Sequence, residues 1–122
     1  MGIDARILLK LREGVTARAI EERLVIAVGV HLDVDELRPS RAEACESTHM
    51  IYTPWRYYGP EYARGPWPII SAVLLELLTS DAVEAIWYAG GDGISRDDPF
   101  TIEEIEEFSR YYHEYANRPY YG

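Results

Sequence analysis

The first third of the chain has the pattern of a strand followed by an amphipathic helix. Residues 5–11 form a short apolar run that ends before a glycine, which predicts a partly buried strand. Apolar residues then recur at intervals of three and four, which predicts a helix over residues 17–28 with charged residues on its outer side. Thr16 is placed to cap this helix, and Gly29 is placed to end it in the left-handed conformation.

The middle of the chain predicts two further strands and a buried helix. Residues 31–35 alternate between polar and apolar as a half-exposed strand does, and residues 48–53 predict a strand that ends at Pro54. A loop is expected over residues 36–47, where charged residues are frequent. Residues 68–78 are almost entirely apolar, which predicts a helix that is buried over most of its surface.

The last third predicts a strand, a glycine-rich turn and a C-terminal helix. Residues 83–88 form the strand, and residues 90–93 turn the chain. Thr101 and Glu104 have the spacing of a capping box, in which each side chain accepts from a backbone N–H of the other residue. The apolar stripe predicted for this helix consists of Ile102, Ile105, Phe108, Tyr112 and Tyr115.

This order of elements predicts an α+β fold. Strand, helix, strand, strand, helix and strand match the ferredoxin-like split βαββαβ sandwich, here with an extra C-terminal helix. In that fold the helices cover one face of an antiparallel sheet. At 122 residues, the chain is expected to form a single α+β domain over residues 1–122. If the strand at residues 31–35 does not form, a three-stranded α+β sandwich remains.

The charge and the cysteine count of the chain narrow its class. The chain carries 12 basic and 21 acidic residues, a formal net charge of −9, which disfavours broad contact with nucleic-acid phosphates. Cys45 is the single cysteine, so no internal disulfide forms, as is typical of a reducing cytoplasm. No apolar run approaches the roughly 20 residues that span a bilayer, and the N-terminus lacks a signal-peptide pattern. We therefore expect a cytoplasmic protein without a membrane partner.

The common catalytic motifs are absent from the sequence. No H-E-x-x-H, C-x-x-C or G-x-S-x-G pattern occurs, so we expect no zinc site, no serine-hydrolase centre and no cofactor. An acid–base pair such as His49 with Asp92 is conceivable, because neighbouring strands could bring the two residues together. A small hydrolase or isomerase therefore stays an alternative to a binding protein.

An aromatic segment follows the third predicted strand. Six Tyr and Trp side chains fall within residues 52–67, roughly three times the density expected from the 12% aromatic content of the chain. Arg56 and Arg64 lie among them. Because aromatic faces stack on planar rings and guanidinium groups bind phosphate or carboxylate, the segment predicts a site for a nucleotide-like anion. The alternative is that these side chains hold a long loop over the core.

The glycine-rich turn completes the predicted site. Its three glycines let the backbone approach a bound group closely, and Asp92 could bind a ribose hydroxyl. The turn matches neither the dinucleotide-binding nor the phosphate-loop pattern, so a plain turn is the alternative. The residues predicted to bind the ligand are Trp55, Arg56, Tyr57, Tyr58, Tyr62, Arg64, Trp67 and Asp92.

Carboxylates gather around the start of the C-terminal helix. Six of them fall within 11 residues: Asp97, Asp98, Glu103, Glu104, Glu106 and Glu107. Acidic residues stabilise a helix N-terminus, which explains them as part of a solvated helix. The alternative is a face that docks on a basic protein, because opposite charges speed the encounter.

Four stretches of the chain resemble a group of small uncharacterised proteins of bacteria and their phages. They are MGIDAR at residues 1–6, RYYGPEYARGPWP at 56–68, WYAGGD at 87–92 and RPYYG at 118–122. The resemblance implies kinship and a shared special loop, and it carries over no catalytic residue. Small phage proteins can act against host defence by sequestering nucleotide signals or masking a defence protein, so an anti-defence role is the expectation that this resemblance implies.

The sequence therefore predicts a non-catalytic protein that binds, and can sequester, a small anionic or nucleotide-like molecule. We expect it to be a homo-oligomer. One alternative is an acidic inhibitor or immunity-type protein that masks a basic protein surface. The other is the small hydrolase or isomerase, acting through the same pocket.

Overall fold

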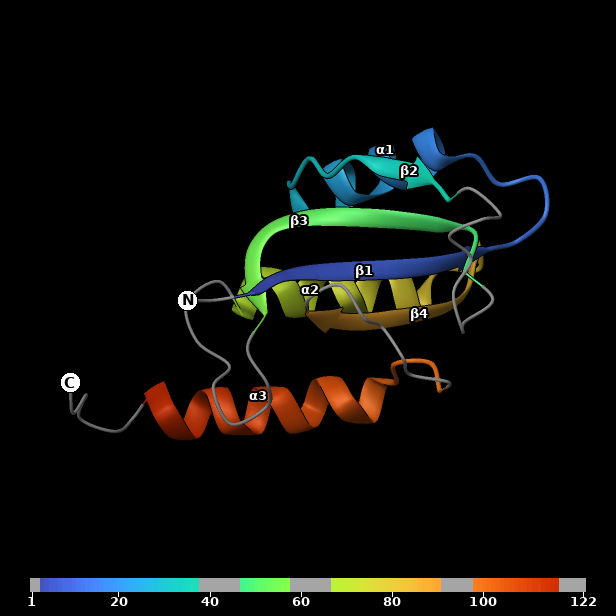
Figure 1. Cartoon of the computed structure of the whole chain (residues 1–122). Coiled ribbons are helices and arrows are strands. Elements are labelled where there is room, and N and C mark those ends of the chain that lie inside the picture. The colour runs from blue at the N-terminus through green and yellow to red at the C-terminus, as the bar shows by residue number, and fades with distance from the viewer. Residues whose placement is uncertain (1–2, 38–46, 58–66, 91–97, 117–122) are drawn as a thin grey trace.

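The computed structural model describes residues 3–37, 47–57, 67–90 and 98–116 (Figure 1). The elements in these ranges are β1 (Ile3–Leu11), α1 (Ala17–Val28), β2 (Val34–Glu36), β3 (His49–Tyr57), α2 (Trp67–Thr79), β4 (Val83–Gly90) and α3 (Ile102–Ala116). No helix in these ranges is long and apolar enough to cross a membrane.

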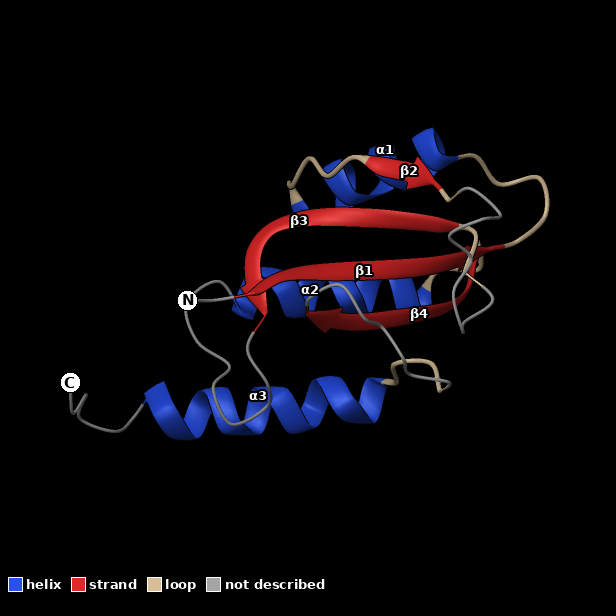
Figure 2. Cartoon of the chain, in the orientation of Figure 1, coloured by secondary structure: helices blue, strands red, loops and turns tan. Residues whose placement is uncertain are grey.

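The four strands form one antiparallel sheet in the order β2-β3-β1-β4. This order is that of the ferredoxin-like sandwich, and α3 is the additional C-terminal helix, so the predicted fold class is confirmed. Figure 2 shows α1 and α2 on the far side of the sheet and α3 alongside β4.

The main core lies between the sheet and the helices. Ala5, Ile7 and Leu9 of β1 alternate into it, and the last two of these side chains have no exposed surface. The residues of α1 and α2 that meet the sheet there are Ile20, Leu24, Ile70, Val73, Leu74 and Leu77. The three-and-four spacing that predicted these helices thus marks their buried sides.

Both predicted helix starts carry their caps. The Thr16 hydroxyl accepts from the backbone N–H of Ala19 at 3.2 Å, and the Thr101 hydroxyl accepts from the N–H of Glu104 at 3.3 Å. Gly29 ends α1 in the left-handed conformation with a φ of 77°. The Thr16 cap, the Thr101 half of the capping box and the glycine stop are therefore confirmed.

α3 docks on the rest of the protein through aromatic rings. Phe108 stacks on Trp67 with 5.1 Å between ring centroids, and it meets Phe100 and Tyr88 edge-to-face at 5.6 and 6.4 Å. Ile105 and Phe108 are buried and Tyr112 packs against the core, as the predicted stripe requires. The predicted stripe is wrong at its first position, because the Ile102 side chain is 40% exposed.

The strand predicted at residues 31–35 begins three residues further along the chain than expected. β2 comprises only Val34–Glu36, which pairs with β3. The N–H of Val34 donates to a carboxylate oxygen of Glu21 on α1 at 3.0 Å, and the N–H of Leu37 donates to the carbonyl of Thr48 at 2.9 Å. These bonds hold the short edge strand, whereas His31 and Asp33 stay exposed before it.

β3 does not end at Pro54, which corrects the sequence prediction. The pairing of β1 with β3 shifts between Arg6–Tyr52 and Asp4–Arg56, so three residues of β3 oppose Ala5 alone. Proline is tolerated at such a bulge because its missing N–H leaves no ladder bond unmade. The hydroxyl of Thr53 donates to the Ala5 carbonyl at 2.8 Å and links the strands across the bulge.

Removing this hydroxyl should destabilise the fold. We expect Thr53→Val to lower the free energy of unfolding by about 1–3 kcal/mol, since the buried Ala5 carbonyl loses a hydrogen-bond donor. Urea denaturation followed by circular dichroism measures the change. Thr79→Val is the matched control, because the Thr79 hydroxyl is exposed and bonds only within its own helix. Equal losses in the two variants would contradict this account of the bulge.

Candidate functional site

The candidate site lies on the face of the sheet turned away from α1 and α2, here called the open face because no described helix contributes to its hydrophobic cluster. Arg6, Leu8 and Lys10 of β1 belong to this face, because they alternate with the residues that enter the main core. In the described part of the chain, no helix contributes a residue to the hydrophobic cluster on this face. Figure 1 views the sheet from this side.

The floor of the open face is apolar. Leu8 pairs directly with Met50 on β3 and with Trp87 on β4, so the three side chains adjoin at the centre of the sheet. They are 6%, 8% and 4% exposed, and Leu37 and Ala85 pack against them. The floor is therefore a second, smaller hydrophobic cluster.

The indole N–H of Trp87 is the unusual polar group of this cluster. The Nε1 atom is buried and has no hydrogen-bond partner among the described residues. A buried donor without an acceptor costs about 1–3 kcal/mol relative to a satisfied one. A ligand oxygen placed beside this atom would remove that cost.

Arg6 and Tyr52 stand next to this floor. They occupy directly paired positions of β1 and β3, and the guanidinium carbon lies 5.3 Å from the centroid of the tyrosine ring. This distance is within the range of a cation–π interaction. Tyr52 is 51% exposed, so its ring offers surface for stacking.

The pairing of the strands brings Arg6 and Trp87 close together. Leu8 pairs with Trp87 and Arg6 pairs with Ala89, so Arg6 and Trp87 are diagonal neighbours on one face. Diagonal neighbours lie within reach of long and aromatic side chains. A cation, a stacking ring and a donor that has no partner among the described residues thus lie next to one another on the open face.

The other end of the open face carries balanced charge. Lys10 lies 3.5 Å from a carboxylate oxygen of Glu84, and both side chains are partly exposed. Such a pair contributes little to stability, but it neutralises the lysine locally. Little net charge is therefore available to an anion at the Lys10 end.

The structure describes four of the eight residues that the sequence analysis grouped into one site. Trp55 is partly buried and packs against the main core, and Arg56 and Tyr57 are strand residues that pair with Asp4 and Ile3. Four further predicted residues lie outside the described residues: Tyr58, Tyr62, Arg64 and Asp92. Because Asp92 is one of these four, the structure does not test the predicted pairing of His49 with Asp92.

Trp67 belongs to the core. It is 3% exposed, stacks on Phe108 and donates from its Nε1 to the Ser109 hydroxyl at 3.1 Å. It can shape a neighbouring site by anchoring α2 and α3, but it offers almost no surface to a ligand.

Arg6 was not among the residues that the sequence predicted, and Trp87 entered only as part of the strand before the glycine turn. The signal for Arg6 is the period-two alternation of Arg6, Leu8 and Lys10 within an apolar run. That pattern shows a strand with two cations on one side. It does not show which aromatic residue lies opposite them.

In the described ranges, no group of three or more His, Cys, Asp or Glu side chains is arranged to hold a metal ion. His49 lies in β3, and its Nδ1 is 2.8 Å from the hydroxyl of Thr48.

Comparison of the chain with family models, with curated proteins and with solved structures finds no match in any of the three.

Proposed function

We propose that this protein binds a small planar anion of the nucleotide type on the open face of its sheet, and sequesters it in the cytoplasm without transforming it. The observation that carries the proposal is the buried indole N–H of Trp87, which finds no acceptor in the described part of the chain and lies beside the Arg6–Tyr52 pair. A donor, a cation and an exposed ring are the groups that a nucleotide requires.

Each group has a distinct role in this proposal. The Arg6 guanidinium binds the anionic group of the ligand, and the Tyr52 ring stacks on its planar part. Trp87 donates its N–H to a ligand oxygen or ring nitrogen. Leu8 and Met50 form the apolar floor under the bound molecule.

The aromatic segment extends the same proposal. The backbone of Arg56 pairs with that of Asp4, two positions along β1 from Arg6. Four further residues predicted to bind the ligand follow Arg56 in the chain: Tyr57, Tyr58, Tyr62 and Arg64. Sequestration lowers the free concentration of a nucleotide signal, which agrees with the anti-defence role that the resemblance implies.

The test is calorimetric titration of the protein with a panel of mono-, di-, tri- and cyclic nucleotides. We expect Arg6→Met to raise the Kd of the bound nucleotide about 10- to 100-fold, the range that follows from losing a charged hydrogen bond. Trp87→Phe should raise the Kd about 5- to 10-fold, because it keeps a ring but removes the N–H donor. Mass analysis of the ligand before and after incubation separates binding from hydrolysis or isomerisation.

Arg18→Met is the matched control. Arg18 is an exposed arginine of α1, on the other side of the sheet, so this change should leave the Kd unaltered. Absence of binding to any nucleotide at millimolar concentration, or unchanged Kd values for both Arg6→Met and Trp87→Phe, would overturn the proposal.

A further inference from the structure

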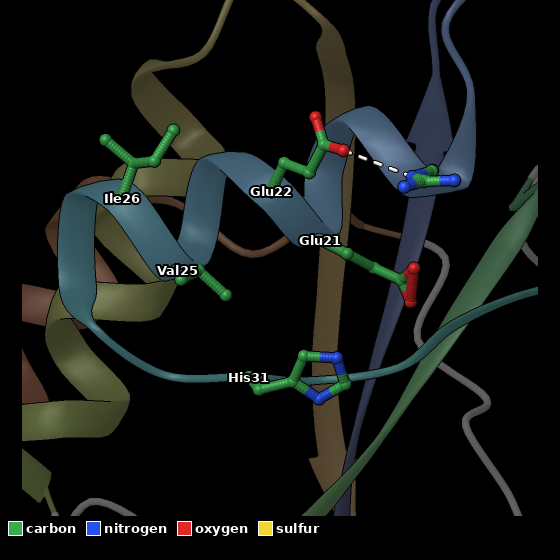
Figure 3. Close-up of a pocket in the computed structure, with 6 residues that line it drawn as sticks. Glu21, Glu22, Val25, Ile26 and His31 are labelled. Carbon is green, nitrogen blue, oxygen red and sulfur yellow. Dashed lines mark hydrogen bonds and ion pairs between the residues drawn. The ribbon is translucent and has the colours of Figure 1, made fainter.

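A second surface feature lies behind the sheet, on the outer side of α1. A depression of about 360 Å³ is lined by Arg18, Glu21, Glu22, Val25 and Ile26 of α1, together with His31 (Figure 3). Figure 3 shows the Glu21 side chain extending from the helix toward the side on which His31 lies. Since α1 covers the core side of the sheet, this depression is separate from the open face.

The apolar part of this depression is exposed to solvent. Ile26 is 86% exposed, the highest value among the large apolar side chains of the described residues, and Val25 is 45% exposed. Both residues precede the glycine that ends α1, so they present a compact aliphatic patch at the end of a helix. Neither is needed to fill the main core.

The charged part of the depression carries one carboxylate that has no cation near it in the described part of the chain. Arg18 lies 3.1 Å from a carboxylate oxygen of Glu22, so those two charges neutralise each other. Glu21 accepts from the backbone N–H of Val34, and among the described residues no cation lies within ion-pair distance of it. A negative charge therefore stands beside the aliphatic patch.

We propose that this depression is a docking surface for a basic segment of a partner protein, in which a lysine or arginine adjoins an aliphatic side chain. The cation would pair with Glu21, and the aliphatic side chain would cover Val25 and Ile26. A small molecule is a poor occupant, because binding pockets enclose most of their ligand and this one leaves its lining exposed. The net charge of −9 adds a general attraction for a basic partner.

Two substitutions probe the surface without disturbing the fold. Glu21→Gln removes the charge but keeps a side-chain oxygen that can accept from the N–H of Val34, so β2 stays anchored. Ile26→Ser removes the aliphatic contact at a position that is almost fully exposed. Circular dichroism and urea denaturation should show both variants folded as the parent is.

The experiment is an NMR titration of the ¹⁵N-labelled protein with a synthetic acetylated and amidated peptide of sequence Lys-Ile-Leu-Lys. We expect peptide-dependent shifts confined to the amides of residues 18–34, and a Kd that rises with salt. Glu21→Gln and Ile26→Ser should each raise the Kd about threefold or more, as loss of a charge pair or of an apolar contact at a rim does. The same peptide with glutamine in place of lysine should bind more weakly than the lysine peptide.

Glu103→Gln on α3 is the matched control, because it removes an exposed carboxylate from the acidic helix that the sequence analysis singled out. Its Kd should equal that of the parent. Shifts that map to α3, an unchanged Kd for Glu21→Gln, or no shifts at five-millimolar peptide (on the order of the weakest affinity worth detecting) would each overturn the docking proposal. These outcomes leave the nucleotide proposal untouched, because it concerns the opposite side of the sheet.

Discussion

Replacing Trp67 by alanine is expected to destabilise the protein more than any change to the open face. We expect Trp67→Ala to lower the free energy of unfolding by about 3–5 kcal/mol, the range for removing a buried aromatic ring. The ring is 3% exposed and stacks on Phe108, and its N–H donates to Ser109, so the change removes packing and a hydrogen bond together. Urea denaturation followed by circular dichroism gives the difference.

Two further variants separate the contributions at this position. Trp67→Phe keeps a ring against Phe108 but removes the bond to Ser109, so it should cost less than Trp67→Ala. Tyr52→Ala should have a much smaller effect on stability, since Tyr52 is 51% exposed, and it should weaken nucleotide binding instead. If Trp67→Ala unfolded at the same urea concentration as the parent and lost only ligand binding, the assignment of Trp67 to the core would be wrong.

The second large effect is expected at the centre of α2. We expect Leu74→Ala to cost about 3–5 kcal/mol, because the side chain is fully buried between the sheet and the helices and its loss leaves a cavity. The adjacent residue is the matched control. Leu75 is also a leucine of α2 but is 44% exposed, so Leu75→Ala should cost about 1 kcal/mol or less.

The contrast between these neighbours tests the orientation of α2 directly. Both substitutions remove the same atoms from the same helix, so differences in helix propensity cancel. The expected result is a midpoint of urea denaturation that falls sharply for Leu74→Ala and only slightly for Leu75→Ala. Equal losses would show that α2 does not bury the side that the structure assigns to the core.

The helices were predictable because their signals are local. Thr16 and Gly29 bound α1 through hydrogen bonds within a few residues of themselves, and Thr101 does the same for α3. The order of the elements then restricts the topology, since helices must cover one face of the sheet. The ferredoxin-like arrangement could therefore be inferred before any coordinates were known.

The errors arose where distant residues decide the outcome. Pro54 was expected to end a strand, but Ala5 receives the hydrogen bond of the Thr53 hydroxyl from across the sheet, and β3 continues. β2 forms at Val34 because Glu21 of α1 accepts from its N–H. Neither partner is near in sequence, so neither error could be corrected by local reasoning.

The candidate site shows the same limit. The density of aromatic and arginine residues after Tyr52 indicated planar-anion chemistry, and this remains a prediction for the residues outside the described ranges. The composition did not indicate that Trp67 is buried against α3 or that Arg6 contacts Tyr52. Those facts follow from strand register, and a shift of one residue would place every side chain on the opposite face.

The amino-acid pattern thus determined which segments become helices and strands, where α1 and α3 begin, and that the chain folds as an α+β sandwich. Only the tertiary structure decided which aromatic rings enter the core and which groups meet on the open face. The physical reason is the range of the interactions. Capping and periodicity act over a few residues, whereas the contact between Leu8 and Trp87 joins the first and the last strand of the chain and exists only once the sheet has formed.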